Sequence, residues 1–287
     1  MRILGVDFTS RPRRAKPIAC AEGCYRRGTL AIEAVRRIDD FAGFENLLGE
    51  DGPWVGGFDF PFGLPRELIE QLGWPPDWRG YVARAARLGR ENFRRLLDGV
   101  RAARPSGAKY LHRATDLPAG SSSPMKLNNP PVALMFFEGA PRLAASGITV
   151  HPCVPGDPAR IALEAYPALL ARGITRRSYK SDTRSEQTPE RTAARRDIVA
   201  AVCGAPRKIL GFDLVLSASV ERAARNDAAG DTLDSVLCAA QAAWGWRRRT
   251  RGYGVAGEAD ALEGWIVGPM NTVRMPRAAW TPPAKSV

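Results

Sequence analysis

The hydrophobic pattern of this chain predicts a sheet of five strands. Short apolar or alternating runs bounded by turn-forming residues are typical of strands. Such runs occur at 2–8, 17–25, 29–37, 53–59 and 159–164. The segment Arg26-Arg27-Gly28 favours a hairpin turn between the second and the third strand. Apolar residues with helical spacing over 41–49 predict a helix before the fourth strand.

Between the fourth and fifth strands the pattern changes to helices separated by loops rich in Pro, Ser, Gly and Asn. We therefore expect a mainly helical insertion at 66–149, whose loops line a site, and a core made of 1–65 and 150–270. The tail at 271–287 is expected to be loose. Further helices are predicted at Thr192–Cys203, Val215–Asn226 and Asp231–Trp246. The expected fold class is α/β, with a mixed sheet flanked by helices.

Composition and charge narrow the classes of function. The 287 residues are enough for one large or two small domains, and an apolar content of 45% is typical of a globular protein. No run of about 18 apolar residues occurs and no leader pattern precedes the first strand, so we expect a cytoplasmic protein without a membrane span. The net charge of +12 favours polyanionic partners, nucleic acid above all.

Several kinds of site find no support in the sequence. The five cysteines have scattered spacing, which is typical of reduced and mostly buried thiols. Only two histidines are present, which argues against His-rich metal sites. The sequence contains no phosphate-binding Gly-rich loop of the common nucleotide motifs and no Gly-x-Ser-x-Gly nucleophile elbow.

Carboxylates gather at the ends of predicted strands and at the start of the last helix. Asp7 ends the first strand and Asp59 the fourth, while Asp231 and Asp234 share one face of the helix that begins there. Carboxylates brought together repel one another unless a cation lies between them, and an all-oxygen set suits Mg²⁺ or Mn²⁺. We therefore expect these four residues to be catalytic metal ligands, with Glu164 at the end of the fifth strand as a further candidate.

Each carboxylate also has a purely structural interpretation. Asp7 could cap a turn, and Asp59 could accept hydrogen bonds from nearby backbone amides. Asp231 could be a helix N-cap, with Asp234 favoured in the first turn by the helix dipole. The occurrence of all four in this order is what favours a shared site.

Basic residues supply candidate phosphate contacts. His112 and Arg113 end an arginine-rich stretch of the insertion, Lys126 lies between two Pro-rich loops, and Lys180 belongs to a polar, basic segment at 175–189. We expect these four side chains to bind the substrate. A solvated helix face explains much of the arginine-rich stretch equally well.

Four motifs resemble the domain-of-unknown-function family 429, whose members are described as predicted nucleases with a ribonuclease H fold. They are Gly5-Val6-Asp7, Phe58-Asp59-Phe60-Pro61-Phe62-Gly63-Leu64-Pro65, Glu164-Ala165-Tyr166-Pro167 and Asp231-Thr232-Leu233-Asp234-Ser235-Val236-Leu237-Cys238-Ala239-Ala240. The resemblance spans nearly the whole chain and implies a ribonuclease H-like mixed five-stranded sheet with carboxylates at the strand ends. The final Asp-x-x-Asp is similar to the arrangement in Holliday-junction resolvases.

The expected function is that of a divalent-metal-dependent nuclease, which hydrolyses phosphodiester bonds of DNA or RNA with Mg²⁺ or Mn²⁺. One alternative is a non-enzymatic module that binds nucleic acid through its basic insertion. Another is an actin-like phosphotransferase or ATP-binding protein, because Gly5-Val6-Asp7-Phe8-Thr9-Ser10 also resembles the first phosphate-binding strand of that class. Gly252-Tyr253-Gly254 is then the only candidate for its Gly-rich loop.

Overall fold

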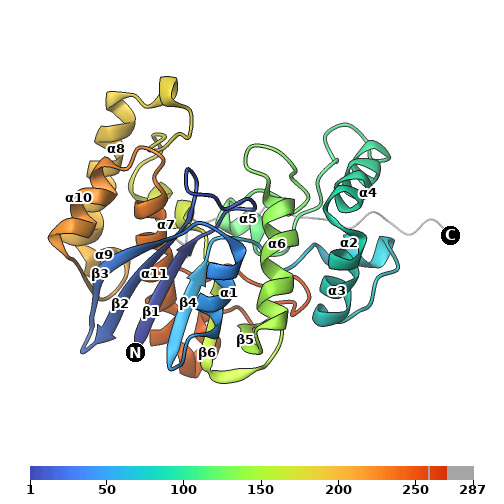
Figure 1. The fold of residues 1–287 in the computed structure, drawn as a ribbon, viewed down its shortest axis with the longest axis horizontal. Helices are drawn as coiled ribbons and strands as arrows, with labels where there is room; N and C mark the ends of the chain where they lie inside the picture. Colours follow the sequence, from blue (N-terminus) through green and yellow to red (C-terminus); the bar gives the residue numbers. More distant parts are fainter. Residues whose placement is uncertain (258, 270–287) are drawn as a thin grey trace.

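A computed structural model describes residues 1–257 and 259–269, and the tail predicted at 271–287 lies outside the described residues. Its centre is a mixed sheet with the strand order β5-β6-β4-β1-β2-β3-β7, flanked by helices (Figure 1). The strands are β1 Arg2–Asp7, β2 Ile18–Arg26, β3 Thr29–Ile38, β4 Trp54–Phe58, β5 Ile148–His151, β6 Asp157–Glu164 and β7 Asp213–Leu216. The prediction of an α/β protein with a mixed, helix-flanked sheet is confirmed.

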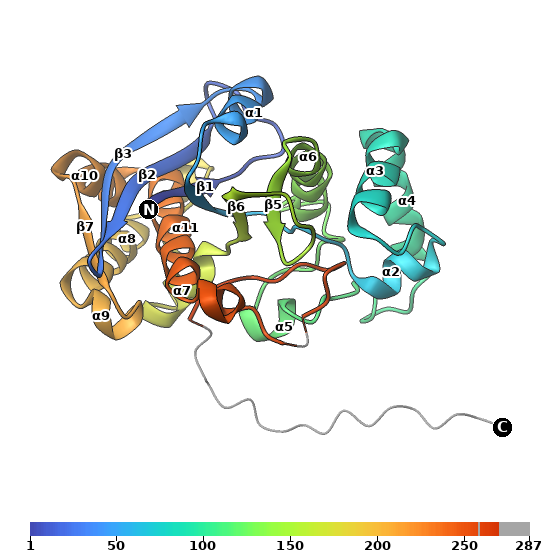
Figure 2. The ribbon, with the colours of Figure 1, turned by 90° about the horizontal axis from the view of Figure 1, so that it is seen from below.

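The longer helices divide between the two faces of the sheet and the region beside it. They are α1 Phe41–Gly49, α3 Trp78–Leu88, α4 Arg90–Ala102, α6 Val132–Ala145, α7 Pro167–Ile174, α8 Pro189–Gly204, α10 Ala218–Asn226 and α11 Asp231–Arg247. Shorter helical segments are α2 Arg66–Gln71, α5 Asp116–Ala119, α9 Pro206–Ile209, η1 Arg184–Glu186 and η2 Arg249–Gly254. Figure 2 shows α1 and α11 on opposite sides of the sheet. None of the described helices is long and apolar enough to cross a membrane.

The sheet has seven strands rather than the predicted five, because a short strand is added at each edge. β5 pairs parallel with β6, and β7 pairs parallel with β3. β7 occupies the start of the segment predicted as a helix at Val215–Asn226. The helix begins only after Ser217, whose hydroxyl accepts a hydrogen bond from the backbone N–H of Val220. Strands of four residues are too short to show a clear period in the sequence.

Successive side chains of β1 point to opposite faces of the sheet, so this strand contributes to two apolar cores. Ile3 packs on the face covered by α7, α8, α10 and α11, whereas Leu4 and Val6 pack on the face covered by α1, α3 and α6. β1 lies between β4, to which it runs parallel, and β2, to which it runs antiparallel. The odd-numbered residues of β1 therefore all face α11.

The helices between β4 and β5 are joined closely to the sheet. α3 packs against α4 and α6, and α2–α4 lie at one end of the molecule (Figures 1 and 2). The hydroxyl of Tyr81 donates to the carbonyl of Leu262 at 2.6 Å and accepts from the backbone N–H of Leu64 at 3.3 Å. Because these helices share one apolar cluster with the sheet, the division into a core and an insertion stays a prediction.

Candidate active site

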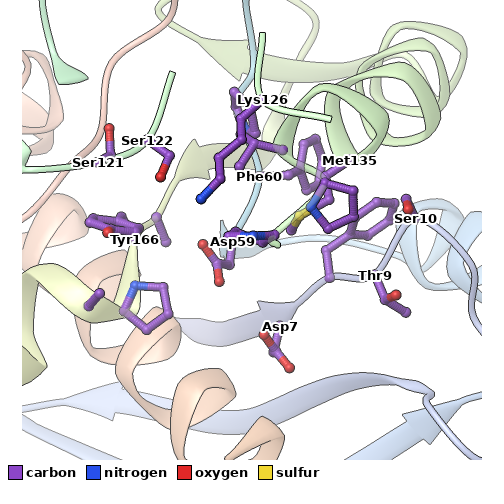
Figure 3. Close-up of a pocket in the computed structure, with 18 of the residues that line it drawn as sticks. Asp7, Thr9, Ser10, Asp59, Phe60, Ser121, Ser122, Lys126, Met135 and Tyr166 are labelled. Atoms are coloured by element: carbon purple, nitrogen blue, oxygen red, sulfur yellow. The ribbon is translucent and has the colours of Figure 1, made fainter. Parts of the chain in front are cut away.

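The floor of the candidate site is formed by two neighbouring strand ends. Val6 of β1 pairs with Phe58 of β4 in a parallel register, so Asp7 and Asp59 follow side by side. The backbone N–H of Asp59 donates to the carbonyl of Val6 at 2.9 Å and holds this register beyond the strand. Both carboxylates are partly buried and line a cavity of about 750 Å³ (Figure 3).

Two glycines allow helix α11 to reach this floor. A Cβ atom on Gly5 would lie 2.1 Å from the carbonyl oxygen of Ser235, and one on Gly57 would lie 2.4 Å from that of Cys238. Only glycine therefore permits the helix backbone to lie directly on β1 and β4. Since alternation places these glycines on the same face as Asp7 and Asp59, the start of α11 meets the two carboxylates.

The two acidic residues of α11 are engaged by lysines from distant loops. Asp231 accepts a hydrogen bond from the Lys16 ammonium at 2.7 Å, and Lys16 also contacts Asp182 at 2.6 Å. Asp234 is fully buried, forms an ion pair with Lys180 and accepts a hydrogen bond from the Tyr179 hydroxyl at 2.6 Å. Two of the five predicted ligands are thus already neutralised by lysines.

Asp7 and Asp59 have no such partner within 1–257 and 259–269. Burial raises the pKa of Asp59 to about 7, with the nearby Asp234 and Glu164 adding to the rise and Lys180 opposing it. Burial also raises the pKa of Asp7 well above its ordinary value, and the carboxylates of Asp234, Asp231 and Asp59 add to the effect. A cation that enters the cavity would therefore stabilise the ionised form of these two side chains.

The donor chemistry of this pair fits a hard divalent cation, which prefers carboxylate oxygens. The structure does not, however, bring the five predicted ligands together. Among the residues it describes, no three His, Cys, Asp or Glu side chains form a group that could hold one ion. A third protein ligand from α11 requires that Asp231 or Asp234 exchange its lysine for the ion.

Glu164 and Arg113, predicted as a metal ligand and a substrate contact, form an ion pair with each other. Phe58 pairs with Glu164, so Glu164 shares the face of Phe58 and points away from the side of the sheet that carries Asp59. There it accepts two hydrogen bonds from Arg113, at 2.6 and 2.8 Å. Arg113 is only 2% exposed and is also paired with Asp116 at 2.8 Å. Buried charges need such partners, and both residues also belong to the lining of the cavity.

The other predicted substrate contacts are placed unequally. Lys126 and Lys180 line the cavity, and Figure 3 shows the Lys126 ammonium directed toward Asp59. Lys180 is committed to Asp234, whereas Lys126 forms no ion pair in the part of the chain that the structure describes. His112 is exposed and does not belong to the cavity lining.

Sequence reasoning missed Lys16, although the chain carries a signal for it. Only six of its 42 Lys and Arg residues are lysine, at positions 16, 109, 126, 180, 208 and 285. Three of the six line this one cavity. Lysine offers a compact, mobile point charge where arginine offers a planar fork, so its use here in an arginine-rich chain marks the site.

The family model described as "Protein of unknown function (DUF429)" matches residues 5–255, and the chain therefore belongs to that family. The prediction made from the four motifs is thereby confirmed as to the family. The matched range contains Asp7, Asp59, Asp231 and Asp234. Comparison with curated proteins and with solved structures finds no match.

Proposed function

We propose that this member of the DUF429 family is a divalent-cation-dependent nuclease that hydrolyses phosphodiester bonds of nucleic acid. One observation carries the proposal. Asp7 and Asp59 lie side by side, without a protein partner among the described residues, at the floor of a cavity whose walls carry lysines. A divalent cation would neutralise the carboxylates at the floor, and a phosphate group would neutralise the lysine charge of the walls.

The topology supports a ribonuclease H-like interpretation of the fold. β1, β2 and β3 form an antiparallel meander, and β4 and β6 extend the sheet in parallel with β1. The carboxylates follow the carboxyl ends of β1 and β4, where open α/β sheets place their ligands. The final helix starts beside them, as that fold and the Asp-x-x-Asp motif lead us to expect.

Four residues of the cavity have a defined task in this proposal. Asp7 and Asp59 would hold Mg²⁺ or Mn²⁺, joined by Asp231 once it leaves Lys16. A bound cation would supply positive charge to the phosphodiester and lower the pKa of a water molecule. Lys126 binds a phosphate oxygen from the opposite side of the cavity. No nucleophilic side chain is required, because the chemistry is direct hydrolysis.

The substitution Asp7→Asn tests the proposal. Cleavage should fall by about a thousandfold, which corresponds to several kcal/mol of lost transition-state stabilisation. The fold should persist, since the amide is isosteric with the carboxyl group. Asp51→Asn, at an exposed position before β4, is the matched control and should cleave normally. Undiminished cleavage by Asp7→Asn would remove the basis for the assignment.

Metal binding provides an independent test. Mn²⁺ titrated into the wild-type protein should release or absorb heat that is absent with Asp59→Asn. Retained affinity for oligonucleotides without any metal-dependent cleavage would instead favour the non-enzymatic binding module. The actin-like alternative receives no support from the cavity, because Gly252-Tyr253-Gly254 lies in η2 and does not line it.

A further inference from the structure

The cavity above the two carboxylates has unlike walls. Figure 3 shows Phe60 and Met135 on one side of Asp59, and Ser121, Ser122 and Tyr166 on the other. Pro131 and Val132 continue the apolar side at the start of α6. One wall therefore suits an apolar, flat group, and the opposite wall suits a group that forms hydrogen bonds.

The size of the cavity limits what it can hold. About 750 Å³ lies within the range of roughly 300–1,000 Å³ that is common for small-molecule sites. Its lining comes from several directions: the ends of β1 and β4, the loops of 121–131, the start of α7 and the segment 179–182. A ligand of this size would contact several of these elements at once.

Lys126 is held in place for an anionic part of such a ligand. Its backbone N–H donates to the carbonyl of Ser123 at 3.0 Å, and its carbonyl accepts from Ala133 at 2.8 Å. The neighbours Met125 and Leu127 are buried, so the backbone on both sides is fixed. Lys126 as a whole is half-buried, and its ammonium carries no protein counter-ion within the described residues, which leaves it for a ligand.

We propose that this cavity binds one nucleoside phosphate unit, with the phosphate at Lys126 above Asp7 and Asp59 and the base against Met135 and the start of α6. The unit is either a free nucleotide or the terminal nucleotide of a strand. The reaction at this unit rests on the nuclease function proposed above, whereas its binding does not. If the ligand belongs to a strand, the proposed site takes the end of that strand and not the middle of a continuous one.

The contacts divide the ligand into two parts that can be tested separately. Calorimetric titrations of the whole protein, with Mg²⁺ and again with EDTA, would compare adenosine monophosphate with ribose 5-phosphate, which lacks the base. Adenosine monophosphate contains no phosphodiester bond and so does not depend on the proposed cleavage. We expect it to bind at least about tenfold more tightly than ribose 5-phosphate, because only the nucleotide buries its base.

Two variants and one control test which residues contact the phosphate and which contact the base. Lys126→Ala should weaken both ligands by about tenfold or more, because both carry the phosphate. Met135→Ala should weaken only adenosine monophosphate, because the base alone contacts that wall. Lys109→Ala, at an exposed position outside the cavity, should change neither. Equal effects of Met135→Ala on the two ligands, or no binding of adenosine monophosphate under either condition, would overturn the proposal.

A competition experiment separates the two sources of the nucleotide. A 5′-phosphorylated linear oligonucleotide and a closed single-stranded circle of the same sequence would each compete against adenosine monophosphate. Competition by the linear strand alone assigns the site to strand ends, and competition by neither assigns it to free nucleotides. Equal competition by the circle would contradict entry by an end. If nucleotide binding holds while Asp7→Asn cleaves normally, the assignment of cleavage to Asp7 fails and the binding site stands.

Discussion

The ionised Asp59 carboxylate destabilises the folded protein, so the substitution Asp59→Asn should raise the free energy of unfolding. Burial raises the pKa of Asp59 to about 7 from its ordinary value of 3.8. Because the pKa is higher in the folded chain than in the unfolded one, ionisation favours unfolding. The penalty is absent below pH 3.8, grows as the pH rises toward 7, and is complete above that pH. An asparagine side chain remains neutral throughout and avoids this penalty.

The magnitude follows from the difference between the two pKa values. One pKa unit corresponds to about 1.4 kcal/mol, so a rise of roughly three units amounts to about 4 kcal/mol above pH 7. Partial exposure of the carboxylate lets water screen part of this penalty. The new amide must also find its own hydrogen bonds. We therefore expect Asp59→Asn to raise the free energy of unfolding by about 2–4 kcal/mol at pH 8, and by almost nothing near pH 4.

Equilibrium unfolding in urea at pH 4, 6 and 8 measures this effect directly. The wild type, Asp59→Asn and the exposed control Asp51→Asn would be compared in EDTA and again with saturating Mn²⁺. A cation that binds only the folded wild type stabilises it by about 3 kcal/mol at a hundred times its dissociation constant. Mn²⁺ should therefore narrow or reverse the difference between the wild type and Asp59→Asn at pH 8.

Two results would refute this reasoning. A variant that is less stable than the wild type at pH 8 would mean that the Asp59 carboxylate makes favourable contacts which outweigh its burial. A stabilisation that is the same at pH 4 and pH 8 would mean that the gain does not arise from ionisation. The control Asp51→Asn should show no pH-dependent change of this size.

The candidate floor could be predicted from the sequence because it depends on local patterns. An apolar run that ends in a carboxylate predicts the end of a buried strand, and both Asp7 and Asp59 lie where those runs predicted them. The parallel register that brings them together is not visible in either run. The strand order supplied that register, through the pairing of Val6 with Phe58.

Glu164 shows why a strand-end carboxylate alone is an insufficient signal. It follows the same design as Asp59 in the sequence, yet it pairs with Phe58 and so faces the opposite side of the sheet. A shift of one residue reverses the direction of every side chain on a strand. Its partner Arg113 lies 51 residues away, and no local pattern predicts an ion pair over that separation.

The lysines that neutralise α11 show a second limit of sequence reasoning. Lys16 and Asp231 are 215 residues apart, and they meet only because the loop after β1 lies over the start of α11. The composition does give a signal for these residues, since the chain uses lysine rarely and yet places three lysines in one cavity. Of the two glycines that bring α11 onto the sheet, Gly5 belongs to a recognised motif and Gly57 directly precedes one, but their packing role appears only in the fold.

Two further substitutions test the architecture that holds the site. Arg113→Met leaves the Glu164 carboxylate buried without its partner and should lower the free energy of unfolding in urea by about 3–5 kcal/mol; a loss below about 1 kcal/mol would contradict the buried ion pair. Gly5→Ala should cost at least about 1–3 kcal/mol, because the new Cβ would lie 2.1 Å from the α11 backbone. Gly49→Ala at the end of α1 meets nothing within 4 Å and should instead stabilise by about 0.4–1 kcal/mol. Because Gly5→Ala must displace the helix that carries Asp231, it should also weaken Mn²⁺ binding in the protein that still folds, whereas Gly49→Ala should leave that binding unchanged. A Gly5→Ala variant with wild-type stability would show that α11 does not lie directly on β1.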